Sequence, residues 1–261
     1  MFCKILKKDL KKDMRWLWIL FVATIAAAGL SRGCKALGEN LMFFKILGIF
    51  FDSVFYSLAV NVILQPFLRN MFNFNKSFYS DEAYLTHTLP VTKKQLITSK
   101  FLTALIEIIL GFICLIISLL IMFISPTFFD TLNLLLSTLI IGKFSLPFVL
   151  ISLIVLIVVE FLMFMSIIFF SSILAHKFKE KRGLKTFLFT AAFAFSAMTA
   201  LSVVMMIMLA INGIDLTSAT VLLSSKSFFS LISTGIVTYS FVTILFYFLA
   251  RKEFNKGVNV D

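Results

Sequence analysis

The sequence contains few of the residues from which soluble domains and enzyme active sites are built. Only 14% of its 261 residues are charged, and it has two histidines, three cysteines and four prolines. The odd number of scattered cysteines (Cys3, Cys34 and Cys114) indicates neither a disulfide framework nor a metal cluster. Both histidines, His87 and His176, lie in or beside polar loops, and there is no GxSxG motif, HExxH motif or paired acidic motif. The sequence therefore does not predict an enzyme.

A phosphate-binding loop of the form GxxxxGK[ST] is lacking as well. Gly142 and Lys143 match its Gly-Lys pair, but Ser137 stands where the first glycine is required. No segment has the alternating strand and helix pattern of the βαβ unit that contains such a loop. We therefore expect no cofactor in this chain, and any ATP hydrolysis would belong to a separate polypeptide.

Long apolar segments are what the sequence has in abundance. Hydrophobic residues make up 60% of the chain, more than a soluble domain of this size can shield from water. Six runs of roughly 20 apolar residues are long enough to cross ~30 Å of hydrocarbon. They lie roughly at 15–31, 43–67, 101–124, 146–174, 187–211 and 228–250. We predict an all-α integral membrane protein with six transmembrane helices in a single domain, residues 1–261. The 33 phenylalanines follow the general bias toward Phe, Ile and Lys and indicate no aromatic site.

Lysine and arginine are distributed unevenly around the six runs. If the N-terminus is cytoplasmic, 19 of the 24 basic residues lie in cytoplasmic segments. Basic residues favour the cytoplasmic side of membrane proteins, so both termini are predicted to be cytoplasmic, in a protein of the cell membrane. The net charge of +11 is then explained by the anionic lipids of the inner leaflet, without nucleic acid as a partner.

The N-terminal stretch is basic and amphipathic. Phe2, Leu6, Leu10 and Met14 recur at four-residue spacing, and lysines occupy the other faces. This pattern predicts an elbow helix over about residues 1–14 that lies on the membrane surface before the chain turns inward. The alternative is a basic flank of the first span that only looks amphipathic.

The longest polar segment, residues 69–100, separates the second and third runs. Ser80 and the two acidic residues after it favour the start of a short helix, which Pro90 ends. Thr92 and Gln95 have the spacing of a capping box, which predicts a new helix running into the third span. A short helix, a break and a transmembrane helix would together form a small cytoplasmic projection.

Residues 79–102, YSDEAYLTHTLPVTKKQLITSKFL, resemble the loop between the second and third spans of bacterial ABC2-type exporter permeases. In that family an acidic-Gly/Ala-Tyr-Leu stretch precedes Thr-Leu-Pro-Val and a basic helix, and Ala83 stands here where relatives often have glycine. The six spans, basic N-terminus and cytoplasmic ends fit the same layout. The resemblance implies a coupling helix that docks on an ATPase subunit. It places this role on Asp81, Glu82, Tyr84, Leu85, Thr86, His87, Thr88, Leu89 and Pro90.

The resemblance also implies what the chain does. It predicts the membrane subunit of an ABC exporter that moves an amphipathic or hydrophobic cargo, such as a peptide, a bacteriocin-like toxin or a drug, out of the cell. Two permease copies, identical or homologous, would pair with two ATPase subunits that hold ATP and Mg. The alternative is a secondary transporter or channel without an ATPase. Its usual marks are internal repeats and Gly- or Pro-broken helices at mid-depth, and the sequence shows no convincing example.

Three carboxylates fall within the apolar runs. Glu107 and Glu160 lie near the middle of the third and fourth spans, where a charge costs at least ~2.5–3.5 kcal/mol. Both are therefore expected to face protein or water, and both are candidates for a translocation path. The alternative for each is a hydrogen bond between helices. Asp52, with Lys45 two helical turns away near the outer face, is expected to snorkel or to meet external partners.

The charge distribution generates a prediction about topology. Cysteines introduced at Asn73, Glu180 and Asn255 should not react with a membrane-impermeant thiol reagent added to intact cells, because these positions are cytoplasmic. Cysteines at Asn133 and Ser218 should react. Labelling at Glu180 from outside the cell would contradict the six-span orientation.

Overall fold

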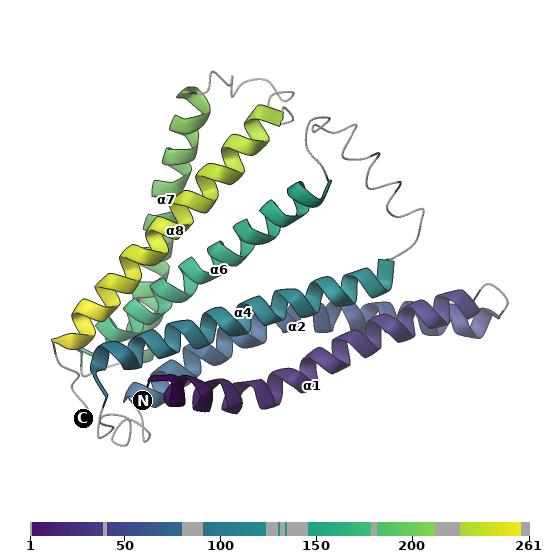
Figure 1. Cartoon of the computed structure of the whole chain (residues 1–261), viewed down its shortest axis with the longest axis horizontal. Coiled ribbons are helices and arrows are strands. Elements are labelled where there is room, and N and C mark those ends of the chain that lie inside the picture. Colours follow the sequence, from purple (N-terminus) through teal and green to yellow (C-terminus); the bar gives the residue numbers. More distant parts are fainter. Residues whose placement is uncertain are drawn as a thin grey trace. The chain divides into compact units, whose positions relative to one another are not determined.

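A computed structural model describes residues 2–38, 41–79, 91–123, 130, 134, 146–178, 182–211 and 225–256. Within those residues six helices are long and apolar enough to cross a membrane, and no strand occurs there, so the predicted all-α, multi-pass architecture is confirmed. Figure 1 shows them as α1 (Phe2–Leu37), α2 (Met42–Tyr79), α4 (Lys93–Phe123), α6 (Leu146–Ala175), α7 (Arg182–Ile211) and α8 (Ser225–Asn255).

The chain divides into two compact units, each with three long helices. Unit 1 comprises residues 1–73 and 90–129, and it contains α1, most of α2 and α4. Unit 2 comprises residues 74–89 and 130–261, and it contains the last turns of α2 together with α6, α7 and α8. Within unit 1, α1 packs along α4; within unit 2, α6 packs along α8, and α7 contacts both.

Helix α1 joins the basic N-terminal stretch and the first span without a break. The elbow helix predicted over residues 1–14 is therefore not a separate element, because its residues form the first turns of a 36-residue helix. The sequence provides no reason to stop there: α1 has no proline, and its two glycines, Gly29 and Gly33, lie near its far end. The stretch is nevertheless amphipathic in the structure, because its apolar residues are partly buried whereas its lysines are exposed.

Two apolar clusters lie between the helices of unit 1. Each contains buried side chains from α1, α2 and α4. The first comprises Leu17, Phe21, Val62 and Cys114, and the second comprises Ala27, Ala28, Phe55 and Met122. All three helices of unit 1 therefore contribute side chains to both clusters.

A proline inside α2 affects how closely α4 approaches it. Pro66 has no N–H, so the carbonyl of Val62, four residues earlier, loses its helical hydrogen bond. At this point α4 carries Gly111, where a Cβ atom would lie only 3.0 Å from the Val62 oxygen. The glycine therefore allows the α4 backbone to lie against the carbonyl that Pro66 leaves free.

Polar contacts tie the far end of α1 to both of its neighbours. Asp52 of α2 pairs with Lys35, with 2.8 Å between Nζ and Oδ2, and it accepts a hydrogen bond from Ser31. Arg32 donates to the carbonyl oxygen of Ile121, at 3.0 Å, in the last turn of α4, where helical carbonyls lack an intrahelical partner. Asp52, which was expected to snorkel or to meet external partners, thus has partners on the neighbouring helix.

The predicted capping box is present at the start of α4. The backbone N–H of Thr92 donates to Oε1 of Gln95, and the backbone N–H of Gln95 donates to Oγ1 of Thr92, both at 3.3 Å. The helix then begins at Lys93. Two N–H groups that a helix start leaves without partners are satisfied in this way, so this local prediction is confirmed.

The contact at Gly111 generates a stability prediction. Gly111→Ala should lower the free energy of unfolding by about 1–3 kcal/mol, the usual cost of forcing an extra methyl group into a packed interior. Gly29→Ala is the matched control, because a Cβ atom there meets nothing within 4 Å. Thermal unfolding in detergent measures both variants. Equal stability of the two would contradict the close approach of α2 and α4.

Candidate functional site

Charged and amide side chains from α1 and α2 meet in the interior of unit 1. Asp13 is only 4% exposed, and its Oδ1 accepts hydrogen bonds from Nε of Arg69 at 2.9 Å and Nδ2 of Asn73 at 2.7 Å. Arg69 and Asn73 are four residues apart, so they lie on the same face of α2. A carboxylate this buried is stabilised only if it is paired and hydrogen-bonded, and Asp13 has both kinds of partner.

A second buried contact joins α2 to α4. Nδ2 of Asn70 donates to Oε2 of Glu107 at 2.6 Å and to the carbonyl oxygen of Pro66 at 2.8 Å. Both hydrogens of the Asn70 amide are therefore used. Glu107 is fully buried, and its Oε1 has no hydrogen-bond partner among the described residues.

A third contact joins α1 directly to α4. Nζ of Lys100 lies 2.9 Å from Oδ2 of Asp9, and both side chains are largely buried. Asp9 and Asp13 are one helical turn apart, so a single face of α1 carries both acids. The inward face of the N-terminal stretch thus pairs with α4 through Asp9 and with α2 through Asp13. We call the contacts of Asp9, Asp13, Asn70 and Glu107 the polar network of unit 1.

The two carboxylates that the sequence suggests for a translocation path belong to different units. Glu107 is part of the polar network of unit 1, and its contact with Asn70 is a hydrogen bond between helices. Glu160 lies on α6 in unit 2, where it is partly buried and close enough to Tyr239 of α8 to influence its hydroxyl electrostatically. Glu107 and Glu160 therefore lie in different surroundings, one in each unit.

The last turns of α2 are held in unit 2 by aromatic rings. The ring of Phe74 stacks on that of Phe169 of α6, with centroids 4.3 Å apart. The ring of Phe78 meets the edge of Phe254 of α8, with centroids 4.8 Å apart. All four side chains are almost completely buried. This cluster was not predicted from the sequence, although the four-residue spacing of Phe74 and Phe78 indicates a shared helical face.

The end of α2 also contacts a histidine just beyond α6. The ring of Tyr79 stacks on that of His176, with centroids 3.6 Å apart. Nδ1 of His176 lies 2.7 Å from the Ser172 carbonyl oxygen, which only accepts, so Nδ1 carries the proton. Burial lowers the pKa of His176 below its ordinary value against the effect of that hydrogen bond, and the charge of Arg182 lowers it further. The neutral ring is therefore the form that fits this stack.

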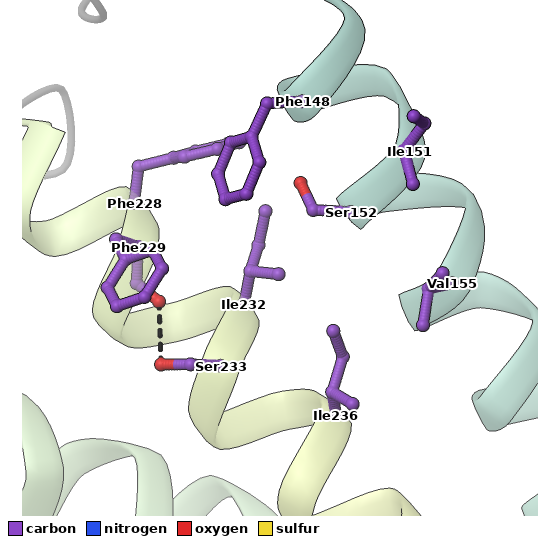
Figure 2. Close-up of a pocket in the computed structure, with 9 residues that line it drawn as sticks. All are labelled: Phe148, Ile151, Ser152, Val155, Phe228, Phe229, Ile232, Ser233 and Ile236. Carbon is purple, nitrogen blue, oxygen red and sulfur yellow. Dashed lines mark hydrogen bonds between the residues drawn. The ribbon is translucent and has the colours of Figure 1, made fainter. Parts of the chain in front are cut away.

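An apolar pocket of about 250 Å³ lies between α6 and α8 within unit 2. Figure 2 shows Phe148 and Ile151 of α6 on one side and Phe228 and Ile232 of α8 on the other. The two serines of the lining bond to carbonyl oxygens of their own helices: Ser152 to Val149 at 2.8 Å, and Ser233 to Phe229 at 2.7 Å. Because these hydroxyls are engaged, the pocket offers apolar surface to whatever enters it.

The nine residues predicted to couple to an ATPase (Asp81, Glu82, Tyr84, Leu85, Thr86, His87, Thr88, Leu89 and Pro90) lie outside the described residues. Both flanks are described, with α2 ending at Tyr79 and α4 beginning at Lys93. Comparison with protein-family models, curated proteins and solved structures finds no match for this chain. The coupling role stays a prediction from the sequence.

The contact between Asn70 and Glu107 generates a prediction about the polar network. Glu107→Gln keeps an oxygen for the Asn70 amide and should fold with nearly unchanged stability. Glu107→Leu has a similar volume but leaves a buried donor unpaired, which should cost about 1–3 kcal/mol. Thermal unfolding of the two variants in the same detergent measures the difference. If Glu107→Leu is as stable as Glu107→Gln, this hydrogen bond does not stabilise unit 1.

Proposed function

We propose that this chain is the membrane-spanning permease subunit of an ATP-driven ABC exporter in the cell membrane, with both termini in the cytoplasm. Six helices long and apolar enough to cross a membrane supply the permease part. The sequence has no phosphate-binding loop, so two separate ATPase subunits would hold ATP and Mg. The resemblance of residues 79–102 to the coupling loop of ABC2-type permeases directs the proposal to this class.

The observation that carries the proposal is how the two ends of that segment are held. On one side, α2 ends in Tyr79, which stacks on His176 in unit 2. On the other side, the Thr92–Gln95 capping box starts α4, whose Lys100 pairs with Asp9 in unit 1. A segment whose ends are anchored in different helix units passes a force applied to it to both units. A coupling element must transmit force in this way if ATPase closure is to move the transmembrane helices.

The apolar pocket of unit 2 favours a cargo with a large apolar part. Its lining offers shape and apolar surface rather than charge, as suits an acyl or aromatic group. An amphipathic peptide, a bacteriocin-like toxin or a hydrophobic drug has such a group. A second permease copy, identical or homologous, would complete the transport path in the proposed exporter.

A secondary transporter or channel that needs no ATPase is the second candidate. The observation that favours it is Glu107, because a fully buried carboxyl group within a span is often part of a proton or ion pathway. Reconstitution in liposomes separates the two functions. The proposed permease alone should show neither ATP hydrolysis nor proton- or sodium-driven uptake. Robust ion-driven transport by the isolated chain would favour the second candidate.

Two substitutions in the predicted coupling helix test the proposal. Tyr84→Ala and Leu85→Asp should leave the permease folded, because the predicted coupling helix would lie outside the lipid. They should reduce the copurified ATPase severalfold or uncouple hydrolysis from export, since a large aromatic side chain often dominates an interface. The chain is purified from its own cells, and the ATPase is identified by its phosphate-binding loop in mass spectrometry.

The matched control is Phe72→Ala, which truncates an exposed aromatic side chain on α2. This variant should keep both the ATPase and export. Normal ATPase retention together with normal export in Tyr84→Ala and Leu85→Asp would remove the coupling assignment from residues 81–90. The proposed function would then lose its residue-level support.

A further inference from the structure

The outward face of the first four turns of α1 carries a line of basic side chains. Each member is three or four residues from at least one other, so the five lie on one side of the helix. All of them are exposed. They are Lys4, Lys7, Lys8, Lys11 and Arg15, and we call them the basic stripe.

Beyond the basic stripe α1 exposes aromatic and then apolar residues, of which Trp18, Ile19 and Val22 continue the same face. Trp16 and Trp18 are the only tryptophans of the chain, and they are 63% and 59% exposed. Tryptophan is enriched where a membrane protein crosses from headgroups to hydrocarbon. Ile19 and Val22 follow and are also exposed. Along its outward face, α1 thus passes from basic to aromatic to apolar, in the order of headgroup, interface and hydrocarbon.

The acidic residues of this stretch do not oppose the basic stripe. Asp9 and Asp13 are the only acids in the first 37 residues. Both point into unit 1, where they pair with Lys100 and Arg69. Their charge is therefore balanced inside the protein, and the field on the outward face of α1 is positive.

We propose that the basic stripe is a binding surface for the headgroups of anionic phospholipids, such as phosphatidylglycerol, in the leaflet that the N-terminus faces. Basic clusters directly next to a transmembrane helix are attracted to such headgroups, and the attraction acts within a Debye length of the surface. A lipid accounts for more of the face than an acidic protein does, because the tryptophans and apolar residues that follow match a membrane. The proposal is independent of any ATPase.

Binding at the basic stripe also affects the packing of unit 1. The same helical turns that present the basic stripe outward present Asp9 and Asp13 to α4 and α2. Headgroups that hold the outward face in place therefore favour the folded arrangement of the three helices. Anionic lipid should bind preferentially and should raise the thermal midpoint of unfolding.

The test uses the full chain in nanodiscs that contain phosphatidylcholine with or without phosphatidylglycerol. The stripe variant carries Lys7→Gln, Lys8→Gln, Lys11→Gln and Arg15→Gln. We expect its apparent affinity for phosphatidylglycerol, measured by mass spectrometry of retained lipids, to fall at least about tenfold. The rise of the thermal midpoint with phosphatidylglycerol should also disappear.

Two matched variants accompany the stripe variant. The charge-matched control changes the net charge by the same amount at other helix ends and should keep the preference for phosphatidylglycerol. It carries Lys93→Gln, Lys94→Gln, Arg251→Gln and Lys252→Gln. Lys7→Arg, Lys8→Arg and Lys11→Arg together keep the charge and should also retain that preference. Circular dichroism checks that each variant is folded. If the stripe variant is not folded, the double variant Lys7→Gln with Lys11→Gln replaces it. The double variant should lose a smaller part of its affinity for phosphatidylglycerol.

Three outcomes would overturn the proposal. The first is unchanged phosphatidylglycerol enrichment in the folded stripe variant. The second is an equal loss in the charge-matched control, which would assign the effect to net charge. The third is a stripe variant that keeps its lipid but loses a protein that copurifies from native membranes, which would make the basic stripe a protein contact.

Discussion

A charged or amide side chain in the interior of a membrane protein must find its partner within the protein, because lipid offers none. Unit 1 is arranged around this constraint. Asp13 reaches Arg69 and Asn73, Asn70 reaches Glu107, and each contact joins two different helices. Apolar side chains would pack almost as well against lipid as against one another, whereas these polar groups are satisfied in only a few arrangements. The polar network therefore supports one particular packing of α1, α2 and α4.

The sequence predicted the features that depend on near neighbours. Six apolar runs indicated six spans, and the three-residue interval from Thr92 to Gln95 indicated the start of α4, because both patterns are complete within one segment. The partner of Asp13 could not be predicted in this way. Arg69 lies 56 positions further along the chain, and periodicity shows which residues share a face but not which faces meet. The same limit explains why the contacts of Asp52 with Ser31 and Lys35 of α1 were not predicted.

Hydropathy also could not show how far the helices continue beyond the lipid. Helix α2 has 38 residues and is about 57 Å long, whereas the hydrocarbon core is only ~30 Å thick. Its last turns contribute Phe74, Phe78 and Tyr79 to unit 2, and composition alone gave these rings no more importance than any other phenylalanine or tyrosine. Their role became visible only when the rings of α6, α8 and His176 were placed against them.

The pairing of Asp13 has a consequence for how the protein enters the membrane during synthesis. Helix α1 emerges from the ribosome before α2 and α4, and its apolar window is the least hydrophobic of the six spans. At about 5–20 residues per second, roughly 3–11 s pass before Arg69 has been synthesised. Lys100, the partner of Asp9, follows later still. During this interval both acids of α1 lack their partners, so α1 completes its contacts only after α2 and α4 have been synthesised.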